Sequence, residues 1–141
     1  MASVKLEIPS AFGYVVAVVC LSWVLLNWLS LQVVRARKRY NVKYPEMYSD
    51  SSLVFNCIQR AHQNTLEGYP SFLVMLLLGG VAFPRMCAGA GVVWIISRVV
   101  YARGYYSGEP SKRTRGAFGY VALLILLICN VVFAVQLLWG N

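Results

Sequence analysis

Acidic side chains are scarce in this sequence, and charged side chains of either sign are few. Five Asp and Glu stand against 13 Lys and Arg among 141 residues, and charged residues make up only 13% of the chain. Soluble domains carry about 25% charged residues. With 59% hydrophobic residues and a mean hydropathy of +0.61, the composition excludes an ordinary soluble domain and indicates a small polytopic membrane protein.

Patterns that bind metals or form disulfide frameworks are also missing. The chain has one histidine and four cysteines, and no two cysteines have the C-x-x-C spacing. Cys20 and Cys129 fall inside apolar runs, where cysteine commonly packs as a small apolar residue. We therefore expect no zinc site, no other metal and no disulfide framework.

Long apolar runs are what the sequence does have. They predict an all-α fold, a four-transmembrane-helix antiparallel bundle with spans over about residues 10–34, 54–83, 87–106 and 116–138. Because these spans use most of the chain, we expect a single integral-membrane domain over residues 1–141.

Most of the positive charge lies in, or close to, the two connections at one side of the expected bundle. Only Lys5 and Arg85 lie on the opposite side of the membrane from the ten others, which are Arg35, Arg37, Lys38, Arg39, Lys43, Arg60, Arg103, Lys112, Arg113 and Arg115. Cytoplasmic connections are typically enriched in Lys and Arg, so both basic connections are predicted to face the cytosol. The net charge of +8 is thus a topology signal, and we expect no nucleic-acid partner.

The second span is unusual because its apolar part is too short. Tyr69 to Phe83 is fifteen residues, or about 22 Å of helix, against a hydrocarbon core about 30 Å thick. Arg60, Asn64 and Glu67 must therefore complete the helix inside or beside the membrane. Ionisable residues at that depth normally face a protein interior, a partner charge or a ligand.

Helical spacing places these polar residues in stripes. Asn56, Arg60, Asn64 and Glu67 share one face of the second helix, and Arg98, Tyr101 and Tyr105 share one face of the third. Together the stripes suit a small zwitterionic ligand with carboxylates and an amine. If the ligand is a thiol, a nearby guanidinium would favour its nucleophilic thiolate.

Structural interpretations remain open for the same residues. Arg60 and Glu67 could instead form an ion pair that fixes helix packing, and Arg98 could take part in it. Arg98 lies about 15 Å along the third helix, and we interpret it as structural. Tyr101 and Tyr105 also suit an interfacial aromatic belt.

Three sequence blocks resemble the MAPEG family of glutathione-dependent membrane enzymes. Within that family, the resemblance is strongest to the microsomal glutathione transferases of type three. The blocks are Ser30–Arg37, Phe55–Pro70 with its Arg-Ala-x-x-Asn-x-x-Glu-x-x-Pro pattern, and Tyr101–Arg113 with Tyr-x-x-Gly-Tyr followed by a basic cluster. The similarity extends from about Arg35 to Gly119. Two residues depart from the pattern of leukotriene-forming relatives: Gly68 replaces a tyrosine and His62 a glutamine.

The resemblance implies a homotrimer in which glutathione is the cosubstrate, bound between subunits near the cytosolic face. It implies glutathione contacts from Arg60, Asn64, Glu67, Tyr101 and Tyr105 of one subunit and from Arg37 and His62 of its neighbour. Arg113 is similar to the arginine that activates the glutathione sulfur, with Arg115 as a possible substitute and Lys38 as a further basic position. The implied location is the endoplasmic reticulum, with the mitochondrial outer membrane as a second possibility.

The implied function is a membrane-bound glutathione transferase that conjugates lipophilic electrophiles, like leukotriene C synthases, or a glutathione peroxidase that reduces lipid hydroperoxides. A non-catalytic lipid-binding scaffold, resembling the five-lipoxygenase activating protein, is the alternative within the family. A small channel or transporter subunit would also use intramembrane charges.

Overall fold

The computed structural model describes residues 7–139, and these residues form helices without any β-strand. The elements are α1 (Phe12–Tyr40), α2 (Leu53–Ala82), α3 (Pro84–Tyr106), the short 3₁₀-helix η1 (Pro110–Gly116) and α4 (Gly119–Trp139). Each of the four α-helices is long and apolar enough to cross a membrane. The predicted all-α architecture with four spans is confirmed.

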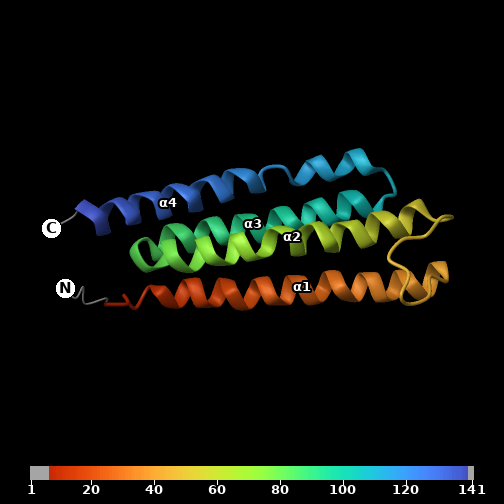
Figure 1. The fold of residues 1–141 in the computed structure, drawn as a ribbon, viewed down its shortest axis with the longest axis horizontal. Helices are drawn as coiled ribbons and strands as arrows, with labels where there is room; N and C mark the ends of the chain where they lie inside the picture. Colours follow the sequence, from red (N-terminus) through yellow and green to blue (C-terminus); the bar gives the residue numbers. More distant parts are fainter. Residues whose placement is uncertain (1–6, 140–141) are drawn as a thin grey trace.

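Consecutive helices run antiparallel to each other along one long bundle (Figure 1). α2 and α3 lie side by side in the middle, α1 packs against both on one side, and α4 packs against both on the other. The α1–α2 connection and η1 lie at one end, whereas the α2–α3 turn lies at the opposite end with the start of α1 and the end of α4 (Figure 1). The topology thus gathers the two basic connections at one end.

Three helix boundaries differ from the sequence prediction. α1 continues to Tyr40 rather than stopping at residue 34, because Lys and Arg are good helix formers and are favoured in a last turn. α3 begins at Pro84, where proline suits a first turn that needs no N–H donor. α4 begins at Gly119, because the basic segment before it winds as η1. α2 begins as expected, with the Ser52 side chain accepting a hydrogen bond from the Phe55 N–H.

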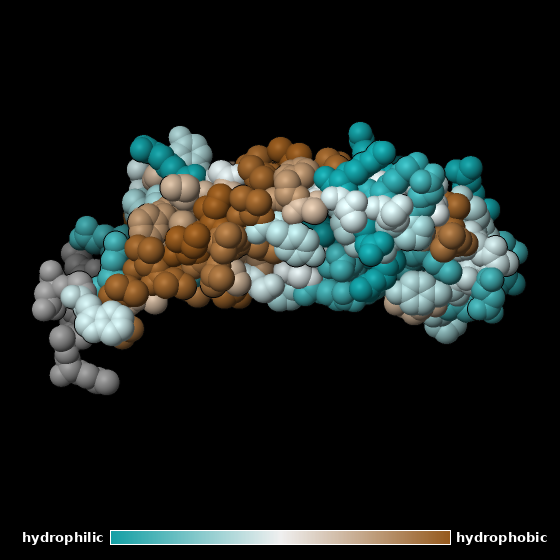
Figure 2. Space-filling model, turned by 90° about the horizontal axis from the view of Figure 1, so that it is seen from above, coloured by the Kyte–Doolittle hydropathy of each residue, from teal (hydrophilic) through white to brown (hydrophobic). Residues whose placement is uncertain are grey.

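Apolar side chains fill the interior and also cover the outside of the bundle. Phe72 and Trp94 stack inside, with ring centroids 3.8 Å apart. On α4, Val121, Leu124 and Ile128 are each more than half exposed. Figure 2 shows this apolar surface over one half of the molecule and a hydrophilic surface over the end with the basic connections. An exposed apolar surface of this extent fits contact with lipid.

The lengths of α1 and α2 place the polar end relative to the membrane. They contain 29 and 30 residues, or about 44 Å each, which exceeds a hydrocarbon core of about 30 Å. Counted from Ala82, about 20 residues of α2 cross the core and reach Gln63. Asn64 and Glu67 therefore lie just inside the core and Arg60 at its boundary. Lys5, which entered the orientation prediction, lies outside the described residues.

Candidate functional site

Side chains from α2, α3 and the two basic connections line a cavity at the end of the bundle that carries these connections. The cavity has a volume of about 220 Å³. Residues that line it include Tyr48, Asn56, Cys57, Arg60, Tyr105 and Pro110. α2, α3 and the two connections each contribute, so the cavity depends on how these elements pack together.

Arg60 and Glu67 of α2 hold each other beside this cavity. The guanidinium donates two hydrogen bonds to the carboxylate, from Nη1 to Oε1 at 2.7 Å and from Nη2 to Oε2 at 3.1 Å. The side chains are 39% and 57% exposed. Both side chains are therefore accessible at the surface of this chain. The ion pair expected from the sequence is present, and Arg98 takes no part in it.

The two asparagines of the predicted α2 stripe face different partners. Asn56 clamps the end of the α1–α2 connection, because its side chain accepts from the Ser49 N–H at 2.7 Å and donates to the Ser49 carbonyl at 2.8 Å. Asn64 instead accepts a hydrogen bond from Arg98 of α3 at 2.8 Å. Within the predicted stripe, Asn56 therefore holds the α1–α2 connection, Arg60 and Glu67 form an ion pair, and Asn64 contacts α3.

Arg98 occupies the interior between α2 and α3. It donates to the Thr65 hydroxyl from Nε at 3.0 Å and from Nη2 at 2.9 Å, and its guanidinium carbon lies 3.9 Å from the centre of the Tyr101 ring. Tyr101 packs edge-on against Tyr105, with centroids 5.3 Å apart. Tyr101 is half-buried and Tyr105 is 9% exposed, so these phenols belong to the interior rather than to an aromatic belt.

The 3₁₀-helix η1 brings Arg113 towards the same cavity. Arg113 donates from Nη1 to the Pro110 carbonyl at 2.7 Å, and its guanidinium lies 5.7 Å from the centre of the Tyr105 ring. Both Pro110 and Tyr105 line the cavity. Arg115, the predicted substitute, is exposed and makes no hydrogen bond with the described residues. Of the two candidate arginines, Arg113 is the one in contact with the cavity wall.

Close packing of η1 against α3 depends on Gly104. A Cβ atom at this position would overlap the backbone carbonyl oxygen of Lys112. Glycine alone lets the η1 backbone approach α3 so closely. The position of Arg113 is thus fixed by the backbone of two elements.

Arg37, Lys38 and His62 do not line the cavity. Arg37 is 8% exposed, donates to the Glu46 carbonyl at 2.7 Å, and lies 4.3 Å from the centre of the Tyr44 ring. It fixes the α1–α2 connection within this chain. Lys38 is exposed and His62 half-buried, and neither side chain makes a hydrogen bond with the described residues. Their expected role towards a neighbouring subunit stays a prediction.

Two features of the site were missed from the sequence. Tyr48 and Pro110 line the cavity from connections, where no helical periodicity indicates which side chains turn inward. Arg98 was interpreted as structural, and its bond to Asn64 depends on the packing of two helices. Residues 7–139 contain no group of three or more His, Cys, Asp or Glu placed to hold a metal ion.

Comparison with known proteins places the chain in a family. Human microsomal glutathione S-transferase 2 is 37% identical over 115 residues, which cover 79% of this chain and 76% of that protein. Bovine leukotriene C4 synthase is 37% identical over 113 residues, covering 79% and 73%. An uncharacterised protein of Synechocystis is 31% identical over 112 residues, covering 79% and 80%. The model of the MAPEG family matches residues 15–132, which confirms the expected family: this chain belongs to the MAPEG family.

Proposed function

We propose that this protein is a membrane-bound glutathione transferase. It activates glutathione as a thiolate and conjugates it to lipophilic electrophiles, as the name of its relative leukotriene C4 synthase suggests, or it reduces lipid hydroperoxides. The observation that carries the proposal is the cavity lined by Arg60 and Tyr105, with Arg113 at its wall. The cavity and its wall offer separate groups for binding a zwitterionic ligand and for activating a thiol.

The Arg60–Glu67 pair suits the charges of glutathione, which has two carboxylates, one ammonium and a thiol. Arg60 would hold a carboxylate in a forked hydrogen bond, and Glu67 would hold the ammonium. Arg60 would then exchange the Glu67 carboxylate for a carboxylate of glutathione, and Glu67 would exchange the Arg60 guanidinium for the ammonium of glutathione. Because both side chains are accessible at the surface of this chain, a ligand can take the place of each partner. Asn64, Tyr101 and Tyr105 would complete the contacts from this chain.

Arg113 is the group proposed to activate the sulfur. A guanidinium near the glutathione thiol lowers the pKa of that thiol and raises the population of thiolate. In conjugation, the thiolate forms a C–S bond with the electrophilic carbon, and the oxygen or halide that leaves carbon takes up the electron pair. In peroxide reduction, two glutathiones supply two electrons, the O–O bond breaks, and an alcohol, water and glutathione disulfide are formed.

The remaining proposals concern the assembly of subunits, the orientation of the protein and its membrane. We propose a homotrimer in which Arg37 and His62 of a neighbour contact glutathione, with Lys38 and Arg115 as further basic groups. The end with the basic connections faces the cytosol, supported by the charge asymmetry, in the endoplasmic reticulum or the mitochondrial outer membrane. Glutathione would enter from water while the apolar substrate arrives through the bilayer.

Turnover by the purified protein tests this function. The detergent-solubilised protein should catalyse glutathione-dependent conversion of an epoxide, a halogenated aromatic or a lipid hydroperoxide. Absence of turnover with all three would contradict it.

A lipid-binding scaffold is the second candidate, because Arg60 and Glu67 already satisfy each other as a structural ion pair would. A scaffold should not bind glutathione, so a binding measurement separates the two functions.

A further inference from the structure

We propose that Arg98 is a positioning residue that fixes the orientation of the Asn64 amide. In this orientation Asn64 presents its NH₂ group to glutathione and recognises an oxygen of the tripeptide, not an N–H group. The inference rests on the proposed function, because it concerns how that same site reads its ligand.

The orientation follows from the chemistry of the two side chains. A guanidinium has only N–H donors, whereas an asparagine side chain has one oxygen acceptor and one NH₂ donor group. Arg98 Nη2 lies 2.8 Å from Asn64 Oδ1. Turning the amide over would bring its NH₂ group against another donor and lose this bond. The amide oxygen is therefore committed to Arg98.

The NH₂ group of Asn64 is left for another partner. Asn64 is half-buried, and its Nδ2 donates to no acceptor among residues 7–139. Glu67 lies three residues further along α2, so the two side chains share a face of the helix. A ligand held by Arg60 and Glu67 would therefore meet the Asn64 donors.

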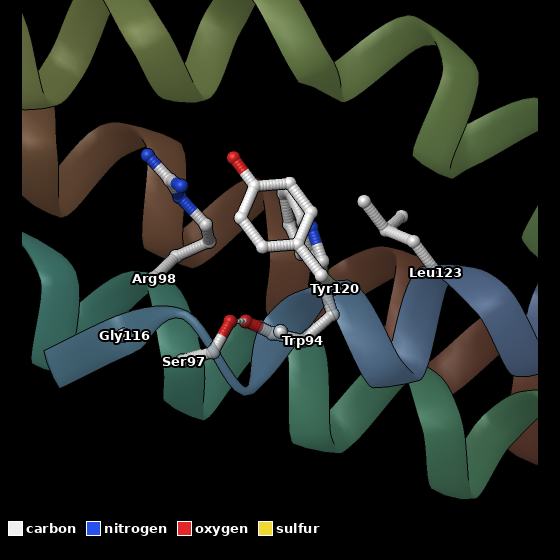
Figure 3. Close-up of a pocket in the computed structure, with 7 residues that line it drawn as sticks. Trp94, Ser97, Arg98, Gly116, Tyr120 and Leu123 are labelled. Atoms are coloured by element: carbon white, nitrogen blue, oxygen red, sulfur yellow. Dashed lines mark hydrogen bonds between the residues drawn. The ribbon is translucent and has the colours of Figure 1, made fainter. Parts of the chain in front are cut away.

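Arg98 is itself held rigidly, as a positioning residue must be. Thr65 is 1% exposed, and its hydroxyl donates to the Ala61 carbonyl at 2.9 Å, so the lone pairs of this oxygen remain for the two N–H groups of Arg98. The Tyr101 ring covers the guanidinium at 3.9 Å. Figure 3 shows Arg98 reaching away from α3 beside the Tyr120 ring, while Ser97 turns back to the Trp94 carbonyl.

The hydrogen-bond partners of Arg98 among the described residues are neutral. They are the Asn64 amide and the Thr65 hydroxyl, with no carboxylate. An arginine inside a membrane-spanning helix is costly and commonly marks a functional site. A lysine would supply the same charge but not the planar fork that reaches both Thr65 and Asn64. The contacts with both Thr65 and Asn64 thus depend on the planar guanidinium of arginine.

The first test is Asn64→Asp, which has nearly the same shape. The aspartate keeps an oxygen for Arg98 but has no NH₂ group, so glutathione should bind about tenfold more weakly, the loss expected for one hydrogen bond of this strength. Binding is measured by titration of the purified protein. An aspartate variant that binds glutathione as tightly as the wild type would overturn the inference, since its oxygen would then accept from the ligand.

The second test asks whether Arg98 acts through Asn64, by a double-mutant cycle with Arg98→Lys and Asn64→Ala. Arg98→Lys should weaken glutathione binding about tenfold in the wild-type background and have no further effect when Asn64 is already alanine. The kcat at saturating glutathione should stay within about twofold, because a ground-state contact is lost. Equal effects in both backgrounds would mean a purely structural role and would overturn the proposal.

Arg103→Lys is the matched control, because Arg103 is on the same helix, exposed, and without a hydrogen bond to the described residues. It should leave glutathione binding unchanged. If Arg98→Lys does not fold, the Asn64→Asp result still decides the orientation. Wild-type protein that fails to bind glutathione would refute the proposed function and this inference together, whereas normal wild-type binding with an unaffected Asn64→Asp variant refutes the inference alone.

Discussion

Replacing Gly104 with alanine should move η1 away from α3 and displace Arg113. The new Cβ would overlap the Lys112 carbonyl oxygen and would lie 2.7 Å from the carbonyl carbon and 3.2 Å from the Arg113 nitrogen. All three are backbone atoms, so no side-chain rotation can relieve the contact. Restoring ordinary van der Waals separation needs a shift of about 1 Å in η1, and Arg113 must move with it.

The expected loss of activity follows from that shift. A misplacement of about 1 Å at a reacting group can lower the rate about 100-fold, which corresponds to about 2.7 kcal/mol in the activation free energy. Arg60, Asn64 and Glu67 lie on α2 and are not displaced, so the KM for glutathione should change much less than kcat. Thiolate absorbance of bound glutathione should fall along with kcat.

Gly89→Ala is the matched control for this prediction. Gly89 also lies in α3, but a Cβ there meets no heavy atom within 4 Å. Both substitutions give the helix the same gain in propensity, up to about 1 kcal/mol, so only the contact with η1 differs. Retention of wild-type kcat and thiolate absorbance by Gly104→Ala, as by Gly89→Ala, would refute the view that close η1 packing positions the activating arginine.

Four further substitutions separate binding, activation and folding. Arg113→Ala should abolish the thiolate absorbance while glutathione binding remains, and Arg115→Ala should change neither; a loss confined to Arg115→Ala would reassign activation. Glu67→Gln should raise the glutathione Kd about tenfold by removing one charged contact. Phe72→Ala should lower the free energy of unfolding by about 3 to 5 kcal/mol, because Phe72 is fully buried against Trp94; a change below about 1 kcal/mol in detergent would contradict that packing.

The helices and the polar segment of α2 could be predicted because both are local properties of the sequence. Apolar runs of span length define the helices, and a spacing of seven residues places Arg60 and Glu67 on one face. Their ion pair was therefore anticipated as a structural alternative. Asn64 and Arg98 lie on the polar stripes predicted for α2 and α3, and a hydrogen bond joins them. That contact depends on the rotation of α3 against α2, which the sequence of neither helix specifies.

The η1 segment shows a different limit. Gly108-Glu-Pro-Ser111 has the composition of a turn, and nothing in Lys112 to Arg115 indicates a 3₁₀-helix folded back on α3. Gly104 gave the only hint, since a glycine in the last turns of a helix can permit close backbone approach. Contact between Arg113 and Tyr105 required the three-dimensional packing, and so did the cavity between them.

We propose that glutathione is both held at this end of the bundle and ionised there. Ultraviolet difference absorbance during titration of the purified protein with glutathione measures both events at once. We predict a saturable thiolate signal at neutral pH that is lost in Arg113→Ala. A wild-type protein that produces no thiolate signal at saturating glutathione would contradict the account.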